Sequence, residues 1–249
     1  MREAVIVQAR VGSSRLKNKM ILPFYEGKTI LQIILEKLLK ELSDVKVILA
    51  TTDNVKDDVL VDSIKNLPVT IYRGSEQNVL ERFVKAAEVN QIDYVVRVCA
   101  DNPFLDVNSI IEILKENQKS KADYTAWFFD NGLPSIKSHS GRFAEGVSLE
   151  ALKRIQTQTD ENLYLEHVTN YIYAHSNLFS IERIKIQNQD FYSSIRLTVD
   201  TESDFQLTKE LYQEYKTKQL TTEIDFQNLV LSRPDLMLTM KKNIENNGK

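Results

Sequence analysis

Short apolar runs alternate with amphipathic stretches through the first half of the chain, and this rhythm constrains the fold more than any other feature. Residues 4–7 form a continuous apolar run of strand length, typical of a strand buried on both faces. We expect further strands at 45–51, 68–72 and 93–99, and helices after Thr29 and at 55–66, 79–89 and 108–117. Such alternation indicates parallel strands with right-handed crossovers. The predicted fold class is therefore α/β, with a mostly parallel central sheet flanked by helices.

The rhythm breaks after about residue 125. Residues 130–142 are predicted to form a loop, and helices are expected from Ser148 and over 166–174. Strands are expected at 178–186 and 196–200, followed by a helix around 205–215 and a helical tail over 221–241. No linker composition separates the halves, so we expect one domain, 1–249, with a protruding middle segment.

Composition excludes several classes of protein. The 32 Lys and Arg against 35 Asp and Glu give a net charge of −3, which argues against a nucleic-acid partner held by diffuse positive charge. No apolar run exceeds four residues, so no membrane span or membrane partner is expected. Cys99 is the one cysteine, which excludes an internal disulfide and a cysteine-based zinc site. These features predict a soluble, cytoplasmic protein.

The loop after the first predicted strand concentrates positive charge. It leaves the carboxyl end of that strand, where open α/β sheets bind ligands. No acid occurs between Glu3 and Glu26, and Gly12 lies in a turn whose N–H groups can point toward an anion. We favour phosphate binding over a solvated basic turn, although the loop is not a Walker A motif. Its four cations are Arg10, Arg15, Lys17 and Lys19.

Two aspartates follow predicted strands. Asp101 comes just before Asn102-Pro103, and Asp200 ends the strand at 196–200. Magnesium needs only a few carboxylates beside phosphate oxygens and water, so both aspartates are candidate ligands. The alternatives are a turn residue before proline for Asp101 and helix N-capping for Asp200. We assign Asp204 to the cap.

Six blocks of the chain carry a resemblance to one family. They are QARVGSSRLKNKMI at 8–21, ATTDN at 50–54, RGSEQNVLERF at 73–83, RVCADNPFLD at 97–106, EHVTNYIYAH at 166–175 and RLTVDTESDF at 196–205. The chain resembles the cytidylyltransferase superfamily that includes CMP-Kdo and CMP-acylneuraminate synthetases, and within it the spore-coat polysaccharide biosynthesis protein F family. The resemblance implies a nucleotide-diphospho-sugar-transferase-like fold (Rossmann-like, GT-A-type), and transfer of CMP from CTP to an acceptor with release of pyrophosphate.

The resemblance also implies roles for single residues. Arg10, Arg15 and Lys19 would neutralise the triphosphate, and Asp101 and Asp200 would hold Mg²⁺. Segment 130–195 would be an inserted acceptor-binding and dimerisation segment, so a homodimer is expected. The implied nucleotide-binding residues are Gln8, Ala9, Arg10, Gly12, Ser13, Ser14, Arg15, Lys19, Arg73, Ser75 and Arg82.

Two arginines leave alternatives open. Arg82 lies on a predicted helix face and could instead be a solvated residue paired with a nearby carboxylate. Arg97 is flanked by valines, so its side chain either points from the strand into the site or forms a structural ion pair.

One block departs from the family pattern. Relatives carry Gly-Leu-Asp-Val-Glu where this chain has Gly-Arg-Phe-Ala-Glu at 141–145. Phe143 replaces the aspartate, which predicts an altered acceptor pocket. Arg142 could pair with a sugar carboxylate or be a surface arginine, and Glu145 matches the family position. Arg142 and Glu145 are therefore the predicted acceptor-binding residues.

The leading hypothesis is a Mg²⁺-dependent cytidylyltransferase acting on a sugar or a sugar acid, resembling 3-deoxy-manno-octulosonate or a nonulosonate, in surface-polysaccharide biosynthesis. One alternative is a glycosyltransferase of related fold. The usual Asp-x-Asp is absent at 101–103, and the triphosphate-sized basic loop favours nucleotidyl transfer. A second alternative is a catalytically silent homologue that acts as a binding subunit.

Overall fold

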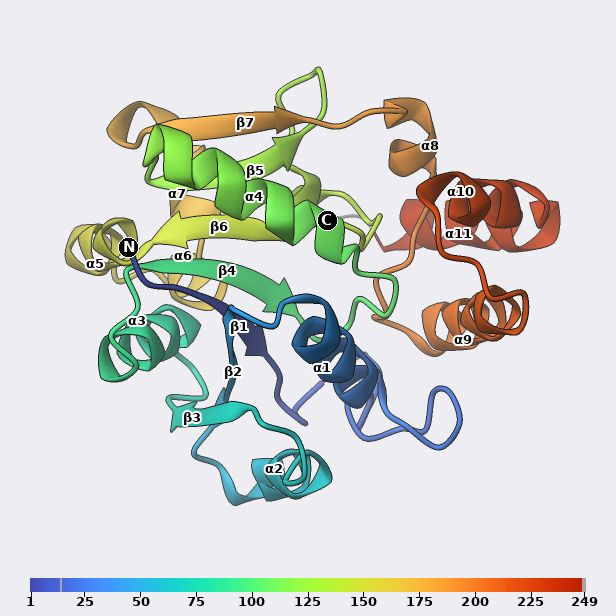
Figure 1. Cartoon of the computed structure of the whole chain (residues 1–249), viewed down its shortest axis with the longest axis horizontal. Coiled ribbons are helices and arrows are strands. Elements are labelled where there is room, and N and C mark those ends of the chain that lie inside the picture. The colour runs from blue at the N-terminus through green and yellow to red at the C-terminus, as the bar shows by residue number, and fades with distance from the viewer. Residues whose placement is uncertain (14, 248–249) are drawn as a thin grey trace.

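A computed structural model describes residues 1–13 and 15–247 of the protein, and its centre is a twisted sheet flanked by helices on both faces (Figure 1). Within these ranges the sheet has seven strands in the order β3-β2-β1-β4-β6-β5-β7. The predicted α/β class is confirmed. The strands are β1 (Glu3–Gln8), β2 (Lys46–Thr52), β3 (Thr70–Gly74), β4 (Tyr94–Cys99), β5 (Tyr124–Phe128), β6 (Glu145–Ser148) and β7 (Ile181–Lys185).

The first four strands are parallel, as the sequence rhythm predicts. In β1, Val5 lies opposite Val47 of β2 and Val96 of β4. Residues 4–7 of β1 are fully buried, because helices cover both faces of this half of the sheet. The carboxyl ends of the parallel strands therefore open toward one edge, where ligands bind in such sheets.

Helices of the first half begin at capping residues. Thr29 accepts from the backbone N–H of Gln32 in a capping box that starts α1 (Ile30–Glu41). Asn78 caps α3 (Val79–Val89), and Asp106 caps α4 (Val107–Ser120). The stretch predicted as a helix at 55–66 is a 3₁₀ turn, η1 (Val55–Asp57), followed by the short α2 (Asp58–Ser63).

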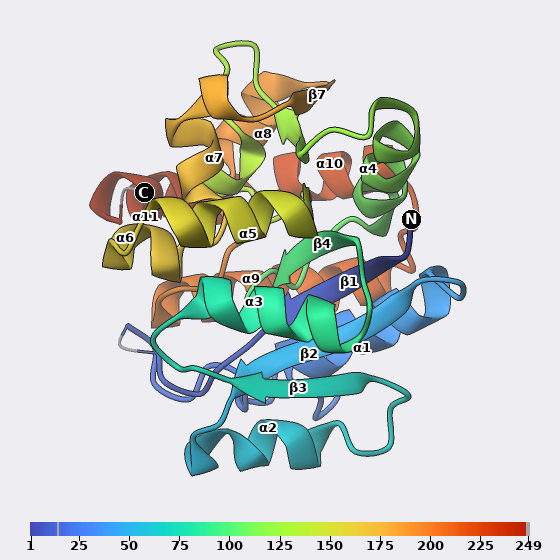
Figure 2. The ribbon, with the colours of Figure 1, turned by 90° about the vertical axis from the view of Figure 1, so that its left-hand side faces the viewer.

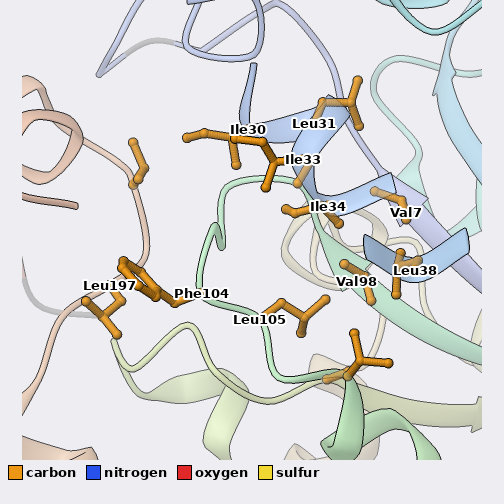
Figure 3. Close-up of a cluster of buried hydrophobic side chains, with 14 of the residues drawn as sticks. Val7, Ile30, Leu31, Ile33, Ile34, Leu38, Val98, Phe104, Leu105 and Leu197 are labelled. Carbon is orange, nitrogen blue, oxygen red and sulfur yellow. The ribbon is translucent and has the colours of Figure 1, made fainter. Parts of the chain in front are cut away.

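Two buried clusters hold these helices on the sheet. One joins α1 and α4 to one face, and Figure 3 shows part of it, with Val7 and Val98 of the sheet near Ile34 and Leu38 of α1. The other joins α3 and α5 (Leu149–Gln158) to the opposite face, where these helices lie side by side (Figure 2). Burial of these apolar side chains supplies most of the driving force for folding.

The other half of the sheet is mixed. Strand β6 runs antiparallel to both β4 and β5, whereas β5 and β7 are parallel. The sequence patterns did not predict β5 or β6. Strand β6 has only four residues, and Gly146 is required because a Cβ there would lie 2.3 Å from the Tyr94 hydroxyl. Segment 130–195 thus contributes β6 and β7 to the sheet.

Three expectations for the second half are corrected. Residues 196–200 belong to no strand in the part of the chain that the structure describes, and the Val199 N–H instead donates to the carbonyl of Asp101 (2.9 Å). The helix at 166–174 is broken into α6 (Asn162–Glu166) and α7 (Asn170–Ala174), because the intervening Thr169 donates its hydroxyl to buried Glu145. The strand at 178–186 shortens to β7, after the 3₁₀ turn η3 (Ser176–Leu178).

The remaining elements are η2 (Ser135–Lys137), α8 (Gln189–Ser194), α9 (Glu202–Thr217), α10 (Glu223–Leu231) and α11 (Pro234–Asn246). The last three form the helical C-terminal part beside α1 and α4. Within the described ranges, no helix combines the length and the apolar character needed to cross a membrane.

Candidate active site

A cavity of about 270 Å³ lies at the carboxyl ends of β1 and β4. Its walls come from the loop after β1, the start of α3, the loop after β4, the α6–α7 junction and the segment before α9. Folding thus brings together most of the predicted site residues, which are far apart in the sequence. The predicted residues in its lining are Gln8, Ala9, Arg10, Gly12, Ser13, Arg15, Lys19, Arg82, Asp101 and Asp200.

Arg10 is held at the rim of this cavity by two partners. Its guanidinium donates to the carbonyl oxygen of Glu76 (3.1 Å) and to the carboxylate of Glu166 (3.0 Å). Glu166 is half exposed, so this ion pair is of the kind that water and salt weaken. Ser13 continues the same loop, and the predicted Ser14 lies outside the described residues.

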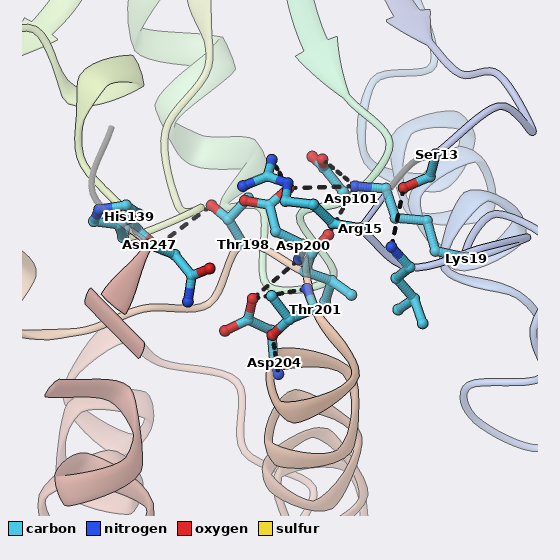
Figure 4. Close-up of polar contacts among 12 residues, drawn as sticks. Ser13, Arg15, Lys19, Asp101, His139, Thr198, Asp200, Thr201, Asp204 and Asn247 are labelled. Carbon is cyan, nitrogen blue, oxygen red and sulfur yellow. Dashed lines mark hydrogen bonds and ion pairs between the residues drawn. The ribbon is translucent and has the colours of Figure 1, made fainter. Parts of the chain in front are cut away.

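Lys19 occupies the centre of the charged site. Its ammonium lies 2.9 Å from a carboxylate oxygen of Asp101, 3.5 Å from one of Asp200, and 2.8 Å from the Val199 carbonyl (Figure 4). Burial works to lower the pKa of Lys19, but the two carboxylates outweigh it and raise that pKa. Arg15 adds a second contact to Asp200 at 2.8 Å. The two predicted metal ligands therefore converge on one cationic atom.

Asp200 is supported from behind by a fully buried arginine. Arg196 lies 3.3 Å from Asp200 and binds Asp204 through two nitrogens, at 2.7 and 2.9 Å. Asp204 also forms a capping box with Thr201 at the start of α9, so its predicted capping role is confirmed (Figure 4). Burial works to raise the pKa of Asp204, and the Arg196 guanidinium holds it below its usual value.

Arg97 combines both roles that the sequence left open. It lines the cavity, and its guanidinium donates to Gln8 (3.0 Å) and to Glu145 (2.5 Å). Glu145 is fully buried and also accepts from the hydroxyls of Tyr124 and Thr169. Glu145 therefore lies behind the lining and reaches the cavity only through Arg97.

Arg82 is a buried cation without an acidic partner in the described part of the chain. Its side chain is almost fully buried and donates to the Ser75 carbonyl (2.5 Å), while its Nε has no hydrogen-bond partner there. Burial, and then the charge of Arg10, lower the pKa of Arg82 to about 10. A buried guanidinium that lacks a carboxylate partner favours the binding of an anion in the cavity beside it.

Three predicted residues lie away from this cavity. Arg142 lines a different cavity, where it donates to the Phe104 carbonyl (2.7 Å), pairs with Glu223 and stacks over a phenylalanine ring. Arg73 donates to the carbonyl of Thr52 and pairs with an acid of α2. Ser75 lines an adjoining hollow that shares Arg10 and Arg82 with the main cavity.

The lining also contains residues to which the sequence assigned no role in the site. Glu166 and His167 were not candidate site residues, and both reach the cavity because α6 ends there. No local pattern marks Glu166, whose partner Arg10 is 156 residues away.

The carboxylates of the site could hold one divalent cation. Within the described ranges, no three His, Cys, Asp or Glu side chains gather as a metal cluster. Asp101 and Asp200 nevertheless contact the same ammonium, so one cation already reaches both. Two carboxylates suit magnesium, which usually completes its shell with phosphate oxygens and water.

The sheet, its crossovers and a cavity at the strand ends define a Rossmann-like fold. Residues 4–227 match the family model described as cytidylyltransferase, and the chain belongs to this family. It is 30% identical to the spore coat polysaccharide biosynthesis protein SpsF of Bacillus subtilis over 234 residues, which are 92% of this chain and 94% of that protein.

Solved structures agree on the fold. A cytidylyltransferase from Leptospira borgpetersenii superimposes with a TM-score of 0.81 over 97% of each chain, at 24% identity. A CMP:2-keto-3-deoxy-manno-octonic acid synthetase complexed with CTP superimposes with a TM-score of 0.65, covering 86% of this chain and 99% of that one, at 13% identity.

Proposed function

We propose that this protein transfers CMP from CTP to a hydroxyl group of a sugar or sugar acid, resembling 3-deoxy-manno-octulosonate or a nonulosonate, in surface-polysaccharide biosynthesis. The acceptor oxygen bonds to the α-phosphorus, the bond from that phosphorus to the α,β-bridging oxygen breaks so that pyrophosphate leaves, and the hydroxyl proton of the acceptor passes to solvent. The observation that carries the proposal is the meeting of the cationic first loop with Asp101 and Asp200 in one cavity. The relatives support it through their names, one a spore coat polysaccharide biosynthesis protein and one a synthetase that holds CTP.

The triphosphate would be bound by Arg10, Arg15, Lys19 and Arg82. Arg82 has no acidic partner in the described ranges, so a phosphate would supply the missing negative charge. Arg10 pairs with the half-exposed Glu166, a weak contact that a phosphate can replace. These cations would stabilise the charge that develops on the leaving pyrophosphate.

Asp101 and Asp200 would hold Mg²⁺, whose charge would neutralise phosphate oxygens. Asp200 is well placed to act as a ligand because Arg196 fixes its orientation from the buried side. Asp101 lies two residues after the end of β4, so its position follows from the sheet itself.

The acceptor would lie near Arg97, on the β4 wall of the cavity. We place the acceptor contact on Arg97 and give Glu145 the role of holding it, since Glu145 is buried behind the lining. A guanidinium at this position suits the carboxylate of a sugar acid. Arg142 pairs with Glu223 elsewhere, so its predicted acceptor contact has no support from its present position.

A pyrophosphate-release screen tests the proposal. CTP, UTP, ATP and GTP are each offered with Mg²⁺ and with matched acidic and neutral sugars. We expect release only with CTP, and faster with acidic sugars. Asp44→Asn, on the exposed turn before β2, serves as the control and should match the wild type. Glycosyl transfer without pyrophosphate, or CTP binding without turnover of any acceptor, would support the alternative functions instead.

The homodimer is a separate part of the proposal, with segment 130–195 as its expected contact region. Sedimentation equilibrium of the full chain tests it, and a monomer at all concentrations would contradict it.

A further inference from the structure

Asp57 is a buried carboxylate that the proposed chemistry does not use. It closes the 3₁₀ turn η1 and is 2% exposed. An aspartate directly before a helix ordinarily caps it, yet the Asp57 side chain makes no capping hydrogen bond to α2. In the described ranges, its hydrogen-bond donors are all neutral groups. The charge of Arg82 acts on it only at longer range, without an ion pair among the described residues.

Those donors come from two segments. Thr51 and Thr52, at the carboxyl end of β2, donate both hydroxyls to one carboxylate oxygen, and the Thr52 N–H donates to it as well (3.2 Å). The other oxygen accepts the backbone N–H of Val11, at 2.7 Å. Asp57 thus connects the first loop to the end of β2 through hydrogen bonds.

The hydrogen bond between Val11 and Asp57 lies at the point where the first loop lines the cavity. Val11 lies between Arg10 and Gly12, which both line the cavity. The N–H groups of Arg10 and Gly12 have no hydrogen-bond acceptor among the described residues. One N–H of this tripeptide is therefore directed to Asp57, and its two neighbours remain available to a ligand. Backbone N–H groups of a loop that are turned toward an anion are a common phosphate-binding arrangement.

We propose that Asp57 is a positioning residue for the triphosphate: by holding the Val11 N–H inward, it presents the N–H groups of Arg10 and Gly12 to the phosphates. The two threonine hydroxyls anchor the carboxylate, so the loop is held in one geometry before the nucleotide arrives. This preorganisation reduces the entropic cost of binding. The inference rests on the proposed function, because it concerns the same cavity.

The test compares Asp57→Asn with Asp62→Asn, which makes the same change on the exposed side of α2. CTP and pyrophosphate are titrated into each variant, and CTP kinetics are measured where an acceptor is turned over. For Asp57→Asn we expect the dissociation constants of both ligands to rise about tenfold, with kcat within about twofold of wild type. Asp62→Asn should bind both ligands as the wild type does. Unchanged affinity in a folded Asp57→Asn variant overturns the proposal.

Amide NMR of the wild type keeps the proposal testable if Asp57→Asn does not fold. The Val11 amide should be protected from hydrogen exchange, and ligand should shift the Arg10 and Gly12 amides more than that of Val11. An exchange-labile Val11 amide would overturn the positioning role. If pyrophosphate binding depends on Asp57 but CTP does not bind, the proposed function is refuted and the positioning role of Asp57 stands. If neither ligand binds the wild type, both the proposed function and the positioning role are refuted.

Discussion

Lys19 and Arg196 each contact two carboxylates, and both of them contact Asp200. Lys19 lies between Asp101 and Asp200 at the cavity, whereas Arg196 lies between Asp200 and Asp204 beneath it. The Lys19 side chain is 11% exposed, and the Arg196 side chain is fully buried.

The difference lies in how easily each cation can exchange its partners. Arg196 presents a planar guanidinium to Asp204, which is also fixed by a capping box and by Asn243 of α11 (2.9 Å). Lys19 is a single ammonium on a flexible stem at the edge of a cavity. A bound cation or phosphate can therefore replace its contacts, whereas replacing those of Arg196 would leave buried charges unpaired. The same charge pattern thus serves ligand binding in one place and stability in the other.

Among substitutions in these two groups of charged residues, the largest expected effect is a loss of activity. Asp101→Asn should lower CTP-dependent pyrophosphate release by about a thousandfold, because a neutral amide is a poor magnesium ligand. Its free energy of unfolding should change by less than about 1 kcal/mol, since Asp101 lies at the cavity surface. Steady-state kinetics and urea unfolding measure both. Full turnover in this variant would refute the metal assignment.

Arg196→Met should act in the opposite way, mainly on stability. We expect a loss of about 3 kcal/mol in the free energy of unfolding, because Asp204 would be left buried without its cation. Arg154→Met is the matched control: its partner is Asp123 and its side chain is 45% exposed, so it should cost under about 1 kcal/mol. Equal losses in the two variants would mean that burial does not distinguish the two ion pairs.

Lys19→Met should lower turnover by about a hundredfold at neutral pH and cost less stability than Arg196→Met. The physical reason is the loss of one positive charge at the phosphates, where Arg10, Arg15 and Arg82 remain. Lys19→Arg should restore part of the rate, because it restores the charge but not the geometry. A stability loss as large as that of Arg196→Met would erase the distinction between the two cations.

The smallest effect is a pH dependence of stability. Burial works to raise the pKa of Asp204, but Arg196 holds it below the ordinary value of 3.8. The ionised carboxylate therefore stabilises the fold above pH 3.8, and this contribution is lost as the pH falls through the lower folded-state pKa. Asp204→Asn should be less stable than wild type by about 1 kcal/mol at pH 7, with the difference shrinking toward pH 3 in urea unfolding. A difference independent of pH would contradict this assignment.

Much of the site was predictable because its signals are local. The cationic first loop follows an apolar strand, and Asp101 follows another, so their meeting at one sheet edge follows from parallel topology. Long-range pairing was not predictable in the same way. Nothing near Arg142 in the sequence indicates that Glu223 will bind it, and nothing near Arg97 indicates the short strand that carries Glu145.

By itself the sequence determined the parallel half of the sheet, the helix starts at Thr29 and Ser148 and the concentration of positive charge after β1, because each depends on neighbours within a few residues. Only the tertiary structure decided which charges pair. Arg15 meets Asp200 across 185 residues of chain, and Val11 meets Asp57 across 46. Such contacts depend on how the strands are ordered and how the connecting segments return to the sheet. They decide which cations are held in the interior and which face a ligand.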